Sequence, residues 1–311
     1  MAKEKPDIIV ICGPTGVGKT GTAIRLAKQF RGEIIGADSM QIYRYMDIGT
    51  AKPTKEEQKE IVHHMIDIRD PDEPYDAGTF ANEALKKITE LKKEGIVPLL
   101  VGGTGLYIKA LIYGFSRETP IDPDVLRRLK EEAKEYGIMV LYERLKEKDP
   151  AAAEKIHPND TFRIVRALEV FEKTGKPIST FHGNHGFSNS RLSTLTIGLK
   201  IERETLYDHI NRRVDEMIKA GLLDEVKGLL QKGYSPKLKP MQSIGYRHMV
   251  EYLQDNLSWE DAISTLQRDT RRYAKRQFTW FKAVDGVKWF NPAQQEEITK
   301  EISAFLRGSR S

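Results

Sequence analysis

The chain of 311 residues contains one cysteine, Cys12. A single cysteine excludes an intramolecular disulfide and any zinc site built on cysteine, and Cys12 lies in a predicted buried strand, where a small apolar role is favoured. No apolar run approaches the roughly 18 residues needed to cross a membrane, and the first run, residues 8–12, is too short for a signal-peptide core. We therefore expect a cytoplasmic protein with no membrane contact.

Low-complexity tracts and internal repeats are also absent, and 39% hydrophobic with 31% charged residues is an ordinary globular composition. At roughly 100 to 200 residues per domain, this length predicts two domains, or one large domain with an insertion. The net charge of +5 is unevenly distributed. Residues 271–282 mix basic with aromatic side chains, which suits an anionic polymer, although a solvated helix face would show the same pattern.

Short apolar runs alternate with helical stretches in the first half of the chain. This pattern is typical of parallel strands joined by crossover helices, and it predicts strands at residues 8–12, 33–38, 63–68 and 97–103. The first strand runs directly into a glycine-rich loop followed by a helical stretch, as a phosphate loop requires. The predicted fold class is therefore α/β, with a parallel-sheet core like that of the P-loop NTPases.

Long charged helices without a strand candidate begin near residue 116. Alternating apolar residues return at 195–201, which we interpret as the last core strand. The predicted organisation is a discontinuous core of residues 1–115 and 194–311, ending in C-terminal helices, with a helical insertion domain at 116–193. One C-terminal helix should begin at Ser258, because Asp261 three residues later completes a capping-box arrangement.

Residues 13–20 read GPTGVGKT, the GxxxxGK[ST] pattern of a phosphate loop. Its glycines let backbone N–H groups turn around an anion, Lys19 supplies a positive charge, and the Thr20 hydroxyl is a candidate Mg²⁺ ligand. The pattern specifies a di- or triphosphate but not what becomes of it. A diphosphate that only leaves would be held as well as one that is hydrolysed.

Two polar side chains follow predicted strands at the carboxyl edge of the sheet, where ligands bind in open α/β folds. Asp38 ends one strand, and Thr104 lies on a tight turn after another. Each is a candidate ligand contact, and each could instead be the N-cap of the following helix. The strand ending in VPLLVGGTG carries no carboxylate of the kind that hydrolases of this class use to hold Mg²⁺.

Seven stretches in family order make the chain similar to the bacterial-type tRNA dimethylallyltransferases, also called tRNA isopentenyltransferases. They are GPTGVGKT (13–20), ADSMQIYRYMDIGTAKP (37–53), HHMIDI with DAGTF (63–80), VGGTGLYIKAL (101–111), RIVRALEV (163–170), SIGYRHM (243–249) and AKRQFTWF (274–281). The resemblance implies transfer of a dimethylallyl group from dimethylallyl diphosphate to N6 of the adenine 3′-adjacent to the anticodon, position 37 of tRNA. The phosphate loop would then hold a diphosphate that departs, in place of the aspartate-rich motifs of many other prenyltransferases.

The resemblance also implies roles for individual residues. Asp38 would act as general base on N6, Thr104 would orient the acceptor or the metal, and Lys19 would stabilise the leaving diphosphate. The cofactor would be Mg²⁺, with Thr20 as its ligand. The predicted diphosphate-binding residues are Gly13, Pro14, Thr15, Gly16, Val17, Gly18, Lys19, Thr20 and Arg213, where the neighbouring Arg212 could take the place of Arg213.

The implied partner is the anticodon stem-loop of tRNA, bound by a monomer. A stacked adenine cannot reach a buried donor, so the base would flip into a channel between core and insertion. The predicted tRNA-binding residues are Asp38, Ser39, Met40, Gln41, Thr104, Arg127, Arg163, Arg166, Gly245, Tyr246 and Arg247. The arginines are chosen because RNA contacts need basic side chains, and a solvated face remains the alternative for each.

Three other functions are compatible with parts of the sequence. An adenylate isopentenyltransferase would share the donor site and Asp38, but the helical insertion and the basic stretch 271–282 argue against it. A P-loop kinase of a small metabolite would transfer a phosphoryl group, for which the chain lacks a clear pattern of lid arginines. A non-catalytic RNA-binding protein would have no use for an intact Lys19, Thr20 and Asp38.

Overall fold

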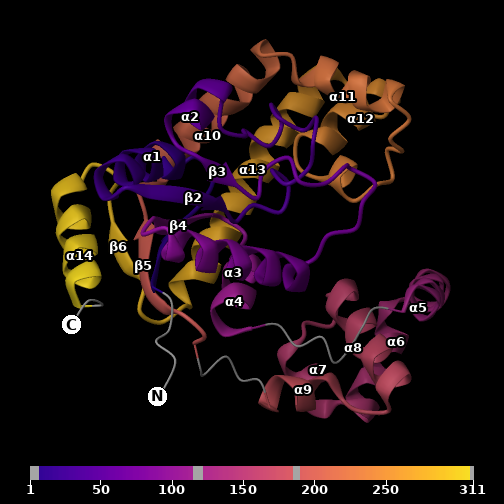
Figure 1. Cartoon of the computed structure of the whole chain (residues 1–311). Helices are drawn as coiled ribbons and strands as arrows, with labels where there is room; N and C mark the ends of the chain where they lie inside the picture. The colour runs from indigo at the N-terminus through magenta and orange to yellow at the C-terminus, as the bar shows by residue number, and fades with distance from the viewer. Residues whose placement is uncertain (1–6, 115–121, 185–189, 309–311) are drawn as a thin grey trace. The chain divides into compact units, whose positions relative to one another are not determined.

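The computed structural model describes residues 7–114, 122–184 and 190–308 (Figure 1). The chain forms two compact units, of which the larger comprises Met1–Ile112 with Arg191–Ser311 and the smaller Tyr113–Ser190. The smaller unit therefore begins and ends three residues before the predicted borders of the insertion at 116 and 193. No helix among the described residues is long and apolar enough to span a membrane.

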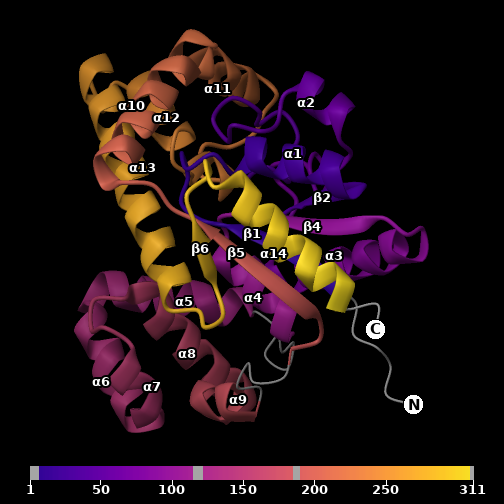
Figure 2. The same cartoon turned by 90° about the vertical axis from the view of Figure 1, so that its left-hand side faces the viewer.

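A six-stranded parallel sheet forms the centre of the larger unit, in the order β3-β2-β4-β1-β5-β6 (Figures 1 and 2). The strands are β1 Asp7–Cys12, β2 Gly32–Gly36, β3 His63–His64, β4 Val97–Gly102, β5 Ser193–Leu199 and β6 Lys288–Phe290. The predicted α/β class with a parallel sheet is confirmed. Strand β1 lies inside the sheet between β4 and β5, which explains its uninterrupted apolar run.

Helices cover both faces of this sheet (Figure 2). Alternate residues of β1 point to opposite faces, and Ile9 and Ile11 pack with α1 (Lys19–Phe30) and α14 (Gln295–Gly308). Helices α3 (Ala77–Lys93) and α4 (Gly105–Tyr113) lie on the other side (Figure 1). Cys12 is fully buried, and burial raises the pKa of its thiol to about 12, so the predicted small apolar role is confirmed.

The prediction that residues 195–201 form the last core strand is wrong. Strand β6 adds to the sheet beyond β5, with Gly198 opposite Trp289. Its three residues, Lys-Trp-Phe, are too few to show a strand period, so only pairing with β5 defines them as a strand. Helix α14 follows and completes the cover of one face (Figure 2).

Four α-helices and one short 3₁₀ turn connect β5 to β6. They are α10 Arg203–Lys219, α11 Leu222–Gln231, the 3₁₀ turn Pro240–Gln242, α12 Tyr246–Leu253 and α13 Trp259–Lys282. The predicted start of α13 is confirmed, because Ser258 Oγ accepts a hydrogen bond of 3.0 Å from the N–H of Asp261. In the first half of the chain, helix α2 (Lys55–Glu60) lies between β2 and β3.

The smaller unit is helical throughout its described part. Its helices are α5 Pro123–Tyr136, α6 Ile138–Lys148, α7 Pro150–Lys155, α8 Thr161–Thr174 and α9 Ile178–Asn184. Leucine, isoleucine and alanine side chains of α5 to α8 form its separate apolar core. Aspartates cap α5, α7 and α8, each accepting a backbone N–H at the first turn. The shared apolar core explains why these helices pack together, and the aspartate caps mark where three of them begin.

Candidate active site

The phosphate loop leaves the carboxyl end of β1 and enters α1, as the sequence predicts. Gly16 and Gly18 have φ of +82° and +93°, a conformation that side chains disfavour. A Cβ at Gly16 would also come within 3.0 Å of Ile210 on α10, so glycine is required there. The loop therefore packs against α10, and its backbone N–H groups lie at the start of α1. The N-terminus of a helix is a place where anions bind.

Lys19 lies inside this loop. Its Nζ donates to the carbonyl oxygens of Gly13 at 3.0 Å and Pro14 at 2.8 Å. Loss of hydration lowers the pKa of Lys19 to about 8, and the nearby Arg213 cation adds to this effect, while the Asp38 carboxylate opposes it. Two cations without a neutralising partner in the loop make the site attractive to an anion.

The loop residues have different surroundings. Thr15, Gly16, Gly18, Lys19 and Thr20 line a cavity of about 910 Å³. Val17 is buried in the apolar core instead, and Gly13 and Pro14 contribute the carbonyls that hold Lys19. The predicted phosphate-binding residues therefore divide into those that face the cavity and those that shape the loop.

Helix α10 supplies the second cation of the site. The guanidinium of Arg213 lies 3.5 Å from Thr15 Oγ1, and burial lowers its pKa while the Asp38 carboxylate raises it. Arg212 is exposed and lies 4.0 Å from Glu216. One turn before Arg213, His209 Nδ1 is 3.2 Å from the carbonyl oxygen of Gly16, a contact that the sequence did not indicate. The geometry thus favours Arg213 over Arg212 at the phosphate loop.

Asp38 follows β2 at the carboxyl edge of the sheet. Its Oδ1 accepts from the N–H groups of Met40 at 2.8 Å and Gln41 at 3.4 Å. These bonds close a turn, and no helix follows, so the alternative of a helix N-cap is wrong. Both bonds use Oδ1, which leaves the other carboxylate oxygen outside the turn.

Thr104 joins the ends of β2 and β4. Its N–H donates to the carbonyl of Ala37 at 3.2 Å, and its Oγ1 accepts from the N–H of Ser39 at 3.1 Å. Thr104 also caps the start of α4, since its carbonyl accepts from Tyr107 and Ile108. Thr104 thus occupies the start of α4, as the cap alternative predicted, and it holds the strand end that carries Asp38. It is not among the residues that line the cavity, so its ligand contact stays a prediction.

Gln277 of α13 connects these two parts of the site, and sequence reasoning missed it. Its Oε1 accepts from the N–H of Thr15 at 2.8 Å, and its Nε2 donates to the carbonyl of Gly103 at 3.0 Å. A Cβ at Gly103 would lie 2.1 Å from Gln277 Nε2, so the glycine makes room for this bond. Tyr273, one turn earlier, hydrogen bonds Thr104 and Gln277, and burial with the Asp38 charge raises its pKa.

The cavity collects these groups in the larger unit. Its volume of about 910 Å³ lies at the upper end of the roughly 300 to 1,000 Å³ typical of ligand pockets. It is lined by residues 38–41 after β2 and also by Arg213 and Gln277, which are distant from them in the sequence. The remaining lining comes from the phosphate loop and α1, from the ends of β2 and β4, from residues near 50 and 240, and from α10 and α13.

The three residues 245–247, predicted to contact RNA, differ in their surroundings. Tyr246 is fully buried, and its hydroxyl donates to Glu225 Oε1 at 2.5 Å, so its side chain presents no surface to RNA. Arg247 pairs with Asp269 of α13. The neighbouring residues Gln242 and Ser243 line the cavity instead. Burial within the helices that cover the site therefore contradicts an RNA contact for the Tyr246 side chain. The RNA contacts of Gly245, which has φ +97° and precedes α12, and of Arg247, whose side chain is 41% accessible, stay predictions.

The predicted arginines of the smaller unit differ in environment. Arg127 and Arg163 are exposed, the latter with 63% of its side chain accessible, and each pairs with a nearby aspartate on its own helix. Arg166 donates to Glu169 at 2.7 Å, and this carboxylate is buried and also accepts from the N–H of Asp122. Arg166 is thus tied to a buried carboxylate of its own helix, whereas the side chains of Arg127 and Arg163 are accessible, and RNA binding by all three stays a prediction.

Metal-ligating side chains do not cluster: no group of three or more His, Cys, Asp or Glu within the described ranges could hold an ion. Thr20 lines the cavity at the first turn of α1. This is compatible with Mg²⁺, which commonly takes one or two protein oxygens and completes its shell with phosphate and water.

A phosphate loop, a half-buried arginine and a carboxylate around one cavity on a parallel sheet define a P-loop protein with a site suited to an anionic substrate. The sequence pattern of the IPP transferase family matches residues 41–284, more than half of the chain. The chain belongs to this family, that of the tRNA dimethylallyltransferases.

Individual relatives span almost the whole chain. The tRNA dimethylallyltransferase of Desulfosudis oleivorans is 53% identical over 304 residues, 97% of each chain. Among solved structures, the tRNA isopentenylpyrophosphate transferase of Bacillus halodurans is 43% identical with a TM-score of 0.74, covering 98% of both chains. A eukaryotic dimethylallyltransferase acting on tRNA is 31% identical with a TM-score of 0.78, covering 96% of this chain and 77% of its own.

Proposed function

We propose that this protein transfers the dimethylallyl group of dimethylallyl diphosphate to N6 of the adenine 3′-adjacent to the anticodon of tRNA. The observation that carries the proposal is that Lys19 of the phosphate loop, Arg213 of α10 and the carboxylate of Asp38 line one cavity. Family membership supports the acceptor and the group transferred. The phosphate loop is then a site for a leaving diphosphate.

In the reaction, a new bond from carbon to N6 replaces the bond from that carbon to the diphosphate oxygen. The adenine N6 attacks the first carbon of the dimethylallyl group, the bond from that carbon to the diphosphate oxygen breaks, and the diphosphate keeps the electron pair. Negative charge therefore grows on the diphosphate, where Lys19, Arg213 and the backbone N–H groups of the loop can stabilise it. These donors are held in place by the protein before reaction, so they cost little reorganisation.

Asp38 is the candidate base for the N6 proton. An exocyclic amine loses a proton readily only as the new C–N bond forms, so a carboxylate of ordinary basicity suffices when it is well placed. Asp38 lies at the sheet edge, and one of its oxygens is fixed by the turn at Met40. The proton would pass from N6 to the carboxylate and then to solvent.

Thr20 would hold Mg²⁺ together with the donor's phosphate oxygens. When bound, the ion supplies additional positive charge to the departing diphosphate. Thr104 and Gln277 would act beside it by keeping the Asp38 strand end and the phosphate loop at a fixed separation.

The proposal is tested by incubating the protein and Mg²⁺ with labelled dimethylallyl diphosphate and an unmodified anticodon stem-loop. A second stem-loop has the adenine 3′ of the anticodon replaced. Label on the first RNA alone supports the proposal. Label on AMP instead would indicate an adenylate isopentenyltransferase, and transfer of a labelled phosphoryl group from ATP would indicate a kinase. Sedimentation of the same sample tests the predicted monomer.

The donor affinity should depend on pH through Lys19. Its pKa of about 8 in the free protein must rise when a diphosphate binds beside the ammonium. Binding above pH 8 therefore takes up a proton, and the affinity should fall by up to about tenfold per pH unit. Calorimetric titration with dimethylallyl diphosphate from about pH 7 to about pH 9 measures this.

Lys19→Arg provides the control for that titration, because a guanidinium stays charged over the whole range. Its affinity should be nearly independent of pH. Equal wild-type affinity at both ends of the range would show that Lys19 does not change its protonation on binding.

Replacing Arg163 by alanine should raise the KM for tRNA and reduce the slope of log KM against log salt by about 1. The physical reason is that a phosphate contact releases counterions, and Arg163 is exposed at the start of α8. Steady-state kinetics at several salt concentrations test it. Lys300→Ala, an exposed cation on α14, is the matched control and should leave the slope unchanged.

A further inference from the structure

The irregular segment 38–53, between β2 and α2, forms one wall of the cavity. Its backbone is unusual, because Tyr45 and Ala51 have φ of +66° and +46°, and Asp67, which packs against it, has φ of +55°. Residues other than glycine keep such conformations only when their surroundings hold them. Polar contacts of buried and half-buried side chains hold this segment in place.

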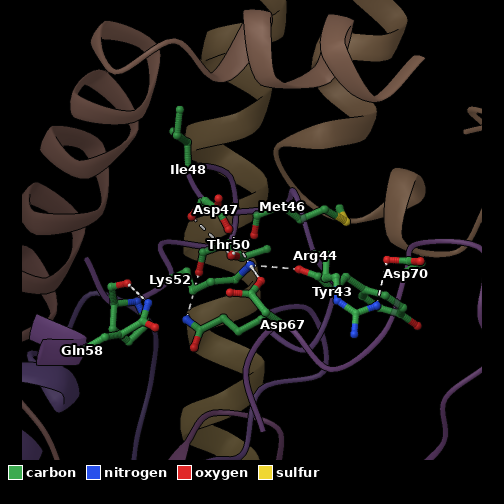
Figure 3. A network of polar contacts seen from close by, with 12 residues as sticks. Tyr43, Arg44, Met46, Asp47, Ile48, Thr50, Lys52, Gln58, Asp67 and Asp70 are labelled. Atoms are coloured by element: carbon green, nitrogen blue, oxygen red, sulfur yellow. Dashed lines mark hydrogen bonds and ion pairs between the residues drawn. The ribbon is translucent and has the colours of Figure 1, made fainter. Parts of the chain in front are cut away.

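Lys52 provides the central contact (Figure 3). Only 3% of its side chain is accessible, and its Nζ lies 2.8 Å from the carbonyl oxygen of Tyr43, 2.5 Å from Asp47 Oδ1 and 2.6 Å from Asp67 Oδ1. Three donors thus meet three oxygens, which is the condition for burying an ammonium without a large penalty. Lys52 thus joins three separate points of the chain, one through a backbone carbonyl and two through aspartate side chains.

A chain of hydrogen bonds leads from Lys52 to Asp38. Asp67 donates its N–H to the carbonyl of Gln41 at 3.3 Å. The side-chain amide of Gln41 donates to the carbonyls of Thr50 at 3.1 Å and Ala51 at 3.2 Å. Gln41 in turn donates its own N–H to Asp38 Oδ1. Three bonded steps therefore join the buried ammonium to the candidate base.

The opposite side of the wall is held by Glu225 of α11. Its carboxylate accepts from the N–H groups of Asp47 at 2.9 Å, Ile48 at 2.8 Å and Gly49 at 3.1 Å. Tyr246 orients that carboxylate by a hydrogen bond. A buried cation on carbonyl and carboxylate oxygens and an anion on N–H groups thus fix residues 43–52 from two sides.

Lys52 lies behind the cavity wall. Gln41, Thr50, Ala51 and Pro53 line the cavity, whereas the ammonium of Lys52 is enclosed by oxygens of the loop. A side chain in this place does not touch substrate. It can act on the reaction only through the positions of the residues that do.

We propose that Lys52 is a positioning residue for prenyl transfer: its buried ammonium fixes segment 38–53 and thereby holds Asp38 and Gln41 on the acceptor side of the cavity. The inference rests on the proposed function, because the reaction defines what Asp38 must reach. The phosphate loop is built by β1 and α1 and is outside this network, so donor binding and group transfer should respond differently.

The test compares Lys52→Met with Lys55→Met. Lys55 lies 4.0 Å from the other oxygen of Asp67 but is 73% accessible, so its replacement removes the same charge without disturbing the buried contacts. Lys52→Met should lower the single-turnover rate by about 10²-fold, the size expected when a reacting group is misplaced by about an ångström. Its affinity for dimethylallyl diphosphate should stay within about twofold of wild type, and Lys55→Met should behave as wild type in both measurements.

Amide hydrogen exchange gives a readout that does not require activity. Lys52→Met should exchange faster over residues 38–53 and 65–69 and unchanged over α1, whereas Lys55→Met should match wild type. If wild-type protein transfers no prenyl group, the proposed function fails, and the exchange experiment still decides whether Lys52 fixes the wall. A folded Lys52→Met protein with wild-type rate and wild-type exchange would overturn the inference.

Asp67→Asn keeps the inference testable if Lys52→Met does not fold. Asparagine accepts the same hydrogen bond and tolerates the positive φ at this position, so only the charge that faces Lys52 is lost. The variant should show a slower single turnover with unchanged donor affinity. A Lys52→Ala protein should regain part of its rate when propylammonium is added, and an Asp67→Asn protein with wild-type rate, together with no rescue by the amine, would contradict the positioning role.

Discussion

Asp38→Asn should lower the single-turnover rate of prenyl transfer by about 10²- to 10⁴-fold while leaving the donor bound. Asparagine can still accept the N–H of Met40, so the turn after β2 is kept and the base alone is removed. The rate is measured by rapid quench with saturating dimethylallyl diphosphate and labelled stem-loop RNA. Asp38→Ala should be at least as slow, because it loses the turn as well.

Donor binding by Asp38→Asn has to be measured below the pKa of Lys19. The Asp38 carboxylate raises the pKa of both Lys19 and Arg213, so its removal lowers them and weakens diphosphate binding at higher pH. At lower pH the affinity should match wild type. A wild-type single-turnover rate in Asp38→Asn would exclude this residue as the general base.

Lys19→Met should reduce both donor affinity and the single-turnover rate, the latter by roughly 10²- to 10³-fold, as for loss of one preorganised donor to a developing anion. The ammonium lies between the carbonyls of Gly13 and Pro14, at the centre of the loop where negative charge grows on the diphosphate. Calorimetry with dimethylallyl diphosphate and rapid quench separate the two effects.

Lys28→Met is the matched control for this experiment, because Lys28 lies on the same helix α1 but is exposed and pairs with Glu60 at 2.8 Å. Its donor affinity and rate should equal those of wild type. If Lys19→Met transferred the prenyl group as fast as Lys28→Met, the phosphate loop would have no part in the departure of the diphosphate.

Two features of the fold show what local sequence can predict. The phosphate loop is eight consecutive residues whose glycine conformations and following helix are determined by neighbours in the chain, so GPTGVGKT predicts both its shape and its preference for anions. The start of α13 depends on Ser258 and Asp261 alone, and it is as predicted. Strand β6 depends on pairing with β5, nearly a hundred residues earlier in the chain, and local sequence did not predict it.

The choice between Arg212 and Arg213 shows why side-chain roles on helices need the tertiary structure. Adjacent residues of a helix point about 100° apart, so only one of the two can face the phosphate loop. Packing of α10 places Arg213 against Thr15 and leaves Arg212 exposed. The family resemblance predicts that an arginine of this helix is used, but it cannot choose between the two neighbours.

The amino-acid sequence by itself determined the α/β class, the phosphate loop, the family and the candidate base Asp38, because each depends on contiguous residues or on apolar periodicity. Only the tertiary structure decided that Tyr246 is buried, that Gln277 connects Thr15 to Gly103, and that Lys52 fixes the cavity wall. These contacts join segments distant in the chain. Which polar group meets which partner there depends on how helices and loops pack, and no local pattern contains that information.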